Sequence, residues 1–354
     1  MRRPLSILSA ALLLLAAGGC DSGGEGDDGP SGSVVVMSQN LYLGGDIFRL
    51  VEEPDPTRIP AVVADLYATA LASDFPARAE AIADAIEDAG AHLVGLQEVT
   101  TYATQTPSDF VTGVTTPNAT DVTVDFLDIL LDALAARGLD YRVASLSPNA
   151  DVELPATTDG QSFFDVRYRD ADAILARADV ATANAVEGSF ETLVTVEVGG
   201  QGQTFVRGYQ HVDATVDGFA FTFVNTHLEV GGPAEFVQSL QAIELDEALG
   251  AVAGPTVLVG DINSDGLTGG TSYNILTADF QDAAPNAGPT CCQDSDIRNE
   301  TSELVTRIDV ILTRGFVGAT GAEVVLDEPS DRVGGLWPSD HAGVWAELEA
   351  GVGS

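Results

Sequence analysis

Residues 255–263 read PTVLVGDIN, an apolar run that ends in an aspartate and an asparagine. The run 255–260 has the length and the β-branched content of a strand that is buried on both faces. Asp261 and Asn263 follow it directly, where the strand ends and a loop begins. A strand end holds a side chain rigidly, so this stretch predicts both a sheet protein and a position for chemistry.

The same arrangement recurs along the chain. Further strands are predicted at 34–37, 92–96, 141–144, 172–177, 191–198, 204–212, 219–226, 304–312 and 342–348. The polar residues that follow such strands or lie inside one are Asn40, Glu98, His227, Asp261, Asn263, Asp309, Asp340 and His341. Several acids gathered in one buried place repel one another, so the pattern predicts a cation among them.

Helical periodicity separates these strands at 77–89, 124–137 and 234–249. In the first helix Arg78 is expected outside the apolar face, and in the third Phe236 and Ile243 are expected to face the sheet. The stretches 100–120 and 148–160 are predicted as loops. The hairpin signal Asp217-Gly218 and the strand-only stretch 191–226 disfavour a purely parallel sheet. The order predicts an α/β (α+β) protein, a two-layer β-sandwich of two mixed sheets flanked by helices.

Six short segments carry a family resemblance when they are taken in order. They are Ser38-Gln39-Asn40, Leu96-Gln97-Glu98, Asn225-Thr226-His227-Leu228, Gly260-Asp261-Ile262-Asn263, Arg307-Ile308-Asp309 and Ser339-Asp340-His341. From about residue 34 to about 348 the chain resembles the endonuclease/exonuclease/phosphatase superfamily, which has the DNase I-like fold. The resemblance implies hydrolysis of a phosphate ester with Mg²⁺, or with Mn²⁺ or Ca²⁺ in its place.

The resemblance also implies a role for each matching residue. The residues expected to bind the metal are Asn40, Glu98 and Asp340. Those expected to bind the substrate are Asn40, Asn263 and His227. The expected catalytic residues are His227, Asp261, Asn263, Asp309 and His341. The chemistry of the residues agrees, because Mg²⁺ prefers oxygen ligands and a carboxylate can fix the tautomer of a histidine that exchanges protons. Asp309 is the expected partner of His341.

Other chemically capable residues lack this context. His92 and His211 are expected to be structural, and Asp46 is expected to be a turn acid. A substrate contact stays open for Asp165 and Asp172, and Glu229 is expected to be solvated. The adjacent Cys291 and Cys292 either form a vicinal disulfide or remain buried thiols.

The charge of the chain limits its partners. Its 354 residues include 54 acids against 15 basic residues, all arginine, for a net charge of −39. Such a surface repels polyanions at long range, which disfavours tight binding to duplex DNA. With 45% hydrophobic residues the chain can still bury a core.

The first twenty residues predict export. Arg2 and Arg3 precede an apolar run at 5–17, and small residues then lead to Cys20. We expect a signal peptide at 1–20 of the lipoprotein type with Cys20 lipidated, a flexible Gly/Ser/Asp linker at 21–33 and one catalytic domain at 34–350. Conventional cleavage, which would give a secreted protein, is the alternative. No other segment is long and apolar enough to span a bilayer.

These observations predict an exported phosphoesterase, held by its lipid at a membrane facing the periplasm or the cell surface. It would hydrolyse a phosphodiester or phosphomonoester by metal-assisted attack of water, with His341 as acid or base. An extracellular nuclease and a sphingomyelinase or phospholipase C-like enzyme remain alternatives. A catalytically inactive binding lipoprotein on the same fold is the alternative of another class. No obligate protein partner is indicated.

Overall fold

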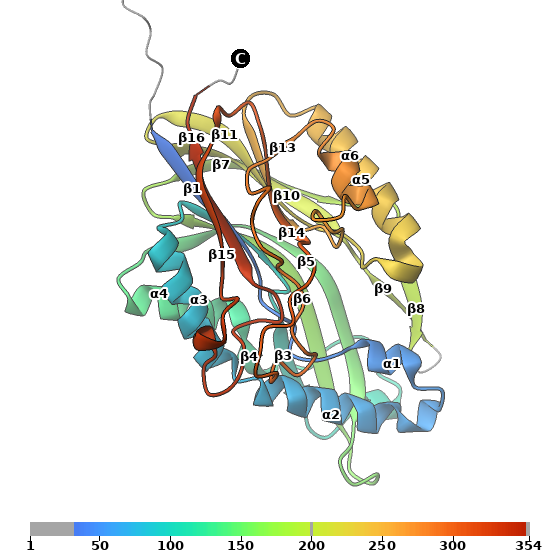
Figure 1. Cartoon of the computed structure of the whole chain (residues 1–354). Helices are drawn as coiled ribbons and strands as arrows, with labels where there is room; N and C mark the ends of the chain where they lie inside the picture. Colours follow the sequence, from blue (N-terminus) through green and yellow to red (C-terminus); the bar gives the residue numbers. More distant parts are fainter. Residues whose placement is uncertain (1–31, 199–200, 352–354) are drawn as a thin grey trace, which may run out of the picture.

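Two mixed β-sheets stack face to face at the centre of the molecule (Figure 1). The computed structural model describes residues 32–198 and 201–351. The predicted signal peptide, Cys20 and nearly all of the predicted linker lie outside these residues. The two-layer sandwich of mixed sheets flanked by helices is confirmed.

The first sheet has eight strands in the order β15-β16-β1-β2-β6-β3-β4, with β5 also paired to β6. Only β1 and β2 run parallel to each other. The bounds are β1 Ser33–Asn40, β2 Leu93–Gln97, β3 Thr101–Gln105, β4 Asp121–Asp125, β5 Tyr141–Ala156, β6 Phe164–Arg177, β15 Gly318–Val325 and β16 Gly343–Glu349.

The second sheet has six strands in the order β13-β14-β12-β11-β10-β7. Here β11 and β12 are the parallel pair. The bounds are β7 Ala181–Ser189, β10 Gly208–Val216, β11 Phe219–His227, β12 Thr256–Asp261, β13 Gln281–Asp282 and β14 Asp309–Arg314. A separate hairpin of β8 Val194–Val198 and β9 Gln201–Phe205 stands beside this sandwich.

Helices cover both outer faces of the sandwich and one end of it (Figure 1). The first sheet is covered by α3 and α4, and the second by α5 and α6, while α1 and α2 pack near the ends of β5 and β6. The bounds are α1 Phe48–Glu52, α2 Ile59–Ala72, α3 Phe75–Ala89, α4 Phe126–Ala136, α5 Glu235–Gly250 and α6 Thr271–Leu276. Among the described helices, none is long and apolar enough to cross a membrane.

Burial on both faces explains the continuous apolar runs in the central strands. In β1, Val36 faces the other sheet and Met37 faces α3, because successive side chains point to opposite faces. The two sheets approach so closely that a Cβ on Gly95 would lie 2.4 Å from Val259 Cγ2. This position in β2 therefore requires glycine.

Several predictions about single elements are wrong. The predicted loop at 100–120 contains β3, and the predicted loop at 148–160 is largely the second half of β5. In α5, Phe236 is 74% exposed, and the buried face carries Gln238, Gln241 and Leu245 instead. The glutamines are buried because they hydrogen-bond loop backbone, among them Gln238 Nε2 to Glu229 O at 2.9 Å.

Arg78 was expected outside the apolar face of its helix, yet it is fully buried. Its Nη1 donates to Leu41 O at 2.8 Å and to Pro338 O at 2.7 Å, and its Nε donates to Ser73 O at 2.9 Å. Burial lowers its pKa to about 10. Arg78 thus ties together the loop after Asn40 and the loop before Asp340.

Candidate active site

The ends of five strands and one loop meet at one edge of the sandwich. The parallel pairs β1–β2 and β11–β12 deliver Asn40, Glu98, His227 and Asp261 there, and the antiparallel register of β12 with β14 sets Asp309 directly opposite Asp261. Asn40 Nδ2 donates to Asp261 Oδ2 at 3.2 Å, which links the two sheets at this point. Residues far apart in the sequence therefore share one site.

His341 is held by two carboxylates. Its Nδ1 lies 2.9 Å from Asp309 Oδ2, and its Nε2 lies 3.8 Å from Asp261 Oδ2. Burial alone would lower the pKa of His341, but the carboxylates of Asp309 and Asp261 outweigh it and raise the pKa well above the ordinary value. The two carboxylates therefore favour the protonated form of the His341 imidazole, whose Nε2 faces Asp261.

His227 approaches Asp261 from the neighbouring strand end. Its Nε2 lies 3.5 Å from Asp261 Oδ2, and Arg207 Nη1 lies 2.8 Å from its Nδ1. Because arginine only donates, Nδ1 must accept and the ring proton sits on Nε2. His227 therefore offers an N–H donor at the centre of the site.

Asn263 fastens the loop that follows Asp261. Its backbone N–H donates to Asp261 Oδ1 at 2.9 Å, and its Nδ2 donates to Leu228 O at 3.0 Å. It sits at a positive φ of 51°, which asparagine tolerates better than most residues. This backbone contact engages one of the two Nδ2 hydrogens, so the other N–H and Oδ1 remain for a substrate or water.

Glu98 and Asp340 lie on the other side of Asn40. Glu98 Oε2 accepts Leu43 N–H at 2.7 Å, and Asn40 Oδ1 accepts Tyr42 N–H at 3.0 Å. Burial and the charge of Glu98, against the opposing charge of His341, together raise the pKa of Asp340 to about 7. Two acids that disfavour each other's charge provide oxygen donors where a divalent cation would relieve the repulsion.

The donor set fits a hard divalent cation such as Mg²⁺. Glu98 and Asp340 supply carboxylate oxygens that are not tied up in an ion pair with a basic residue. Ligand atoms of Asp261, Asp309 and His341 also lie within 4.8 Å of one another. His341 already pairs with both of these acids, so Glu98 and Asp340 are the residues left to hold a cation.

Three further charged residues lie at the site; of these, the sequence had left a substrate contact open for Asp172 and had not identified Asp170 or Arg207. Asp170 and Asp172 lie on one face of β6, and Arg207 lies between β9 and β10. Burial and then Asp172 raise the pKa of Asp170 to about 7. Burial would lower the pKa of Arg207, but Glu229, Asp170 and Asp172 outweigh it and raise the pKa. The alternation of two acids in an apolar strand was a usable signal, whereas Arg207 had none.

The residues that were assigned no catalytic role from the sequence lie as predicted, except Glu229. His92 Nδ1 accepts Val35 N–H at 2.9 Å, and Asp46 Oδ1 accepts Phe48 N–H at 3.1 Å, so both are structural. Asp165 is buried and accepts backbone N–H groups of the loop at Asp109 and Phe110, so it holds this loop in place. The exception is Glu229, which is buried beside Arg207 and not solvated.

The sulfur atoms of Cys291 and Cys292 face each other in this structure, which favours the vicinal disulfide over two separate buried thiols. Cys291 forms β-bridges with Thr306 and with His341. The cystine therefore lies directly behind the loop that carries the site histidine.

Solved structures share this architecture. An endonuclease/exonuclease/phosphatase family protein from Bacteroides thetaiotaomicron is 17% identical with a TM-score of 0.55, covering 90% of this chain and 98% of that one. The mannosyl-6-phosphatase of the same organism is 18% identical with a TM-score of 0.54, covering 89% and 99%. A humanized D. rerio TDP2 is 14% identical with a TM-score of 0.52, covering 89% and 98%. At these identities the likeness shows the fold.

Sequence comparison identifies the family independently of the fold. No curated protein sequence matches the chain. The sequence pattern of the endonuclease/exonuclease/phosphatase family matches residues 37–341, which include every strand-end residue described above. The resemblance noted in the sequence is thereby confirmed, and the chain belongs to the endonuclease/exonuclease/phosphatase family.

Proposed function

We propose that this chain is a divalent-metal-dependent phosphoesterase that hydrolyses a phosphodiester by attack of water. The observation that carries the proposal is the pairing of His341 with Asp309 beside Asp261, next to the separate acid pair of Glu98 and Asp340. One group of residues is suited to moving protons and the other to holding a cation. Membership of a family that includes phosphatases supports the same conclusion.

Each group then has a defined task. When bound at Glu98 and Asp340, Mg²⁺ offsets the negative charge that develops on the phosphoryl oxygens. Asp261 orients the attacking water and takes its proton, and His227 donates Nε2–H to a phosphoryl oxygen. His341, kept protonated by Asp309, gives its proton to the departing oxygen. Asn40 holds Asp261 in place and borders both groups.

The charge of the chain favours small phosphodiesters over duplex nucleic acid. Fifteen arginines against 54 acids leave no broad cationic track for a polyanion. An extracellular nuclease is therefore the less favoured member of the same class.

Hydrolysis of bis-p-nitrophenyl phosphate with Mg²⁺ tests this function. We expect release of p-nitrophenolate that stops when a chelator is added and falls about 10²–10⁴-fold in His341→Ala. The matched control is His211→Ala, since His211 is a half-buried histidine of β10 outside the site. Equal rates in the wild type and His341→Ala would refute the catalytic assignment and favour a binding protein.

We also propose that the protein is exported and anchored through a lipid on Cys20. The supporting features are the basic start of the chain, the apolar run at 5–17 and the small residues before Cys20. Expression of the full chain followed by fractionation and fatty-acid labelling tests this. Label and membrane association that disappear in Cys20→Ser are expected. Unlabelled wild-type protein in the medium would indicate conventional cleavage.

A further inference from the structure

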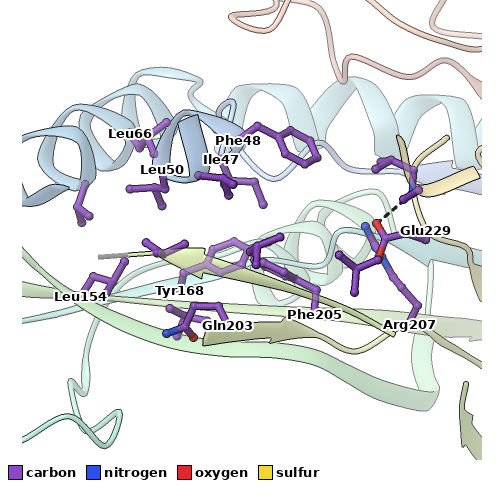
Figure 2. Close-up of a pocket in the computed structure, with 18 of the residues that line it drawn as sticks. Ile47, Phe48, Leu50, Leu66, Leu154, Tyr168, Gln203, Phe205, Arg207 and Glu229 are labelled. Atoms are coloured by element: carbon purple, nitrogen blue, oxygen red, sulfur yellow. Dashed lines mark hydrogen bonds between the residues drawn. The ribbon is translucent and has the colours of Figure 1, made fainter. Parts of the chain in front are cut away.

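An apolar pocket opens beside the candidate active site (Figure 2). Side chains of α1 and α2 form one wall, and strands β5 and β6 with the β8–β9 hairpin form the other. Its cavity volume is about 260 Å³. Apolar side chains dominate the lining, among them Ile47, Phe48, Leu50, Leu66, Leu154 and Phe205.

The alternation of apolar and polar residues in the β8–β9 hairpin forms one wall of the pocket, so the pocket is not a packing defect. Val194, Val196 and Val198 of β8 line it, while Thr195 and Glu197 between them are exposed. Alternation of this kind turns one face of a strand toward a dry environment. Phe48 at the rim is 51% exposed, so the pocket is reachable from solvent. Protein interiors are normally close-packed, and an apolar hollow of this size fits an apolar ligand group.

One end of the pocket is continuous with the catalytic residues. Arg207 and Glu229 both line that end (Figure 2). Arg207 Nη1 lies 2.8 Å from His227 Nδ1, so the same guanidinium borders the apolar pocket and the site of phosphate chemistry. Its Nε is buried without a hydrogen-bond partner in the described structure. A donor held in this way can be satisfied by an oxygen of a ligand.

The ligand that matches both features is an amphiphile with an anionic head. An unfilled donor at the inner end suits a phosphoryl oxygen, and the apolar walls beyond it suit a hydrocarbon group. A polyanion fits neither the apolar walls nor the net charge of −39. The β8–β9 hairpin is a two-stranded sheet of its own, so one wall of the pocket comes from residues outside the two central sheets.

We propose that the substrate is a phosphate ester carrying an alkyl chain, with the chain seated in this pocket and the phosphate beside Arg207 and His227. The inference rests on the phosphoesterase function proposed above and narrows its substrate class. A membrane phospholipid and a soluble alkyl phosphodiester share this chemistry.

A homologous pair of substrates tests the proposal. Methyl p-nitrophenyl phosphate and octyl p-nitrophenyl phosphate are compared as monomers with Mg²⁺, below the micelle concentration of the octyl ester. Each buried methylene contributes about fourfold in affinity. Burial of only about three of the additional methylenes of the octyl group would therefore raise kcat/KM about 60-fold over that of the methyl ester. Equal kcat/KM for both esters would overturn the pocket assignment and leave the phosphoesterase function intact. No release from either ester would overturn the phosphoesterase function itself.

Two matched variants locate the effect. Val196→Arg places a charge on the pocket face of β8 and is expected to reduce the octyl-to-methyl ratio to within about threefold of one. Thr195→Arg makes the same charge change on the exposed face of the same strand and should keep the ratio. Using a ratio guards against partial unfolding, which lowers both rates together. An unchanged octyl-to-methyl ratio in Val196→Arg would mean that the alkyl group binds outside this pocket.

The physical form in which the ester is supplied distinguishes a membrane phospholipid from a soluble alkyl phosphodiester. The octyl ester is supplied once as a monomer and once in phosphatidylcholine vesicles. Faster hydrolysis in vesicles indicates a membrane lipid, and faster hydrolysis of the monomer indicates a soluble ester. The proposal is contradicted if the octyl ester is hydrolysed no faster than the methyl ester in either form.

Discussion

At the scale of single residues, the partnership of His341 with Asp309 defines the chemistry. The 2.9 Å contact fixes which ring nitrogen faces the site, and the charge of Asp309 raises the pKa of the imidazole. Asp309 is buried with one oxygen, Oδ1, lacking a partner in the described structure. Its Oδ2 influences the site through the contact with His341.

The first prediction concerns that pair. Asp309→Asn keeps the shape of the side chain but removes the charge that raises the pKa of His341. Hydrolysis of bis-p-nitrophenyl phosphate is expected to fall about 10²–10⁴-fold. Asp213→Asn is the control, since Asp213 is exposed and contacts Asn184. A rate within about twofold of wild type would show that the pair does not support proton transfer.

A second prediction concerns Asp170 and pH. Burial and Asp172 raise its pKa from 3.8 to about 7 in the folded protein. The folded state thus keeps a proton that the unfolded chain loses, so stability falls as pH rises from about 4 to about 7. Thermal unfolding measured with a chelator across this range should show the decline, and Asp170→Asn should reduce its slope, leaving the part due to Asp340, whose pKa is also raised to about 7.

The matched variant for this series is Asp121→Asn, because Asp121 is exposed in β4. It should leave the pH dependence as in wild type. An identical decline in Asp170→Asn and wild type would mean that other groups cause it.

At the scale of elements, one side chain positions two active-site loops. Arg78 of α3 donates to the carbonyls of Leu41 and Pro338. Leu41 directly follows Asn40, and Pro338 lies two residues before Asp340. Ser339 Oγ in turn donates to Asn40 O at 2.7 Å. The helix therefore holds the cation side of the site in register with the histidine side.

Removal of this tie is the third prediction. Arg78→Met leaves buried carbonyls without a donor and should lower the free energy of unfolding by about 3 kcal/mol or more. It should also lower the hydrolysis rate, because both loops loosen. Arg49→Met is the control, since Arg49 forms only an exposed ion pair with Asp65 and should cost within about 0.5 kcal/mol. Urea unfolding of both variants measures the difference.

The fourth prediction concerns the contact between the sheets. In Gly95→Ala the new methyl would meet Val259 Cγ2 at 2.4 Å and Asn225 Oδ1 at 2.7 Å. Asn225 also accepts from Gln97 and donates to Leu96 O, so it cannot move freely. The free energy of unfolding should fall by about 1–3 kcal/mol.

Gly318→Ala is the matched change, because no atom lies within 4 Å of the position a Cβ would take there. It should be close to neutral in the same unfolding assay. Equal stabilities of both variants would contradict the close approach of the two sheets.

The central strands could be predicted from sequence because burial on both faces makes them continuously apolar. The strand-end residues could be identified because polar groups directly after such strands stand out. The prediction failed where tertiary contacts override local pattern, as for the buried Gln238 and Arg78, which satisfy loop backbone. Arg207 was missed because its importance comes only from the partners that the fold brings to it.

At the scale of the whole molecule, the net charge of −39 surrounds a site that must admit an anion. Long-range repulsion slows the approach of an anionic ester, and salt screens such repulsion over about 10 Å at 0.1 M. A cation held by Glu98 and Asp340, as proposed, and the guanidinium of Arg207 would provide local attraction once the ester arrives.

The fifth prediction follows from this charge. With Mg²⁺ saturating, kcat/KM for bis-p-nitrophenyl phosphate should rise as NaCl is increased from low to moderate concentration, because screening removes repulsion. Initial rates over a salt series measure the effect. A steady fall with salt would instead indicate that local cationic groups dominate the approach.

The central claim is that the strand ends gather one cation beside a proton-transferring histidine. Anomalous diffraction from crystals soaked in Mn²⁺ tests it most directly. We expect a peak about 2.0–2.3 Å from carboxylate oxygens of Glu98 and Asp340, on the Asn40 side of His341. A peak elsewhere, with both carboxylates unbound, would contradict the account.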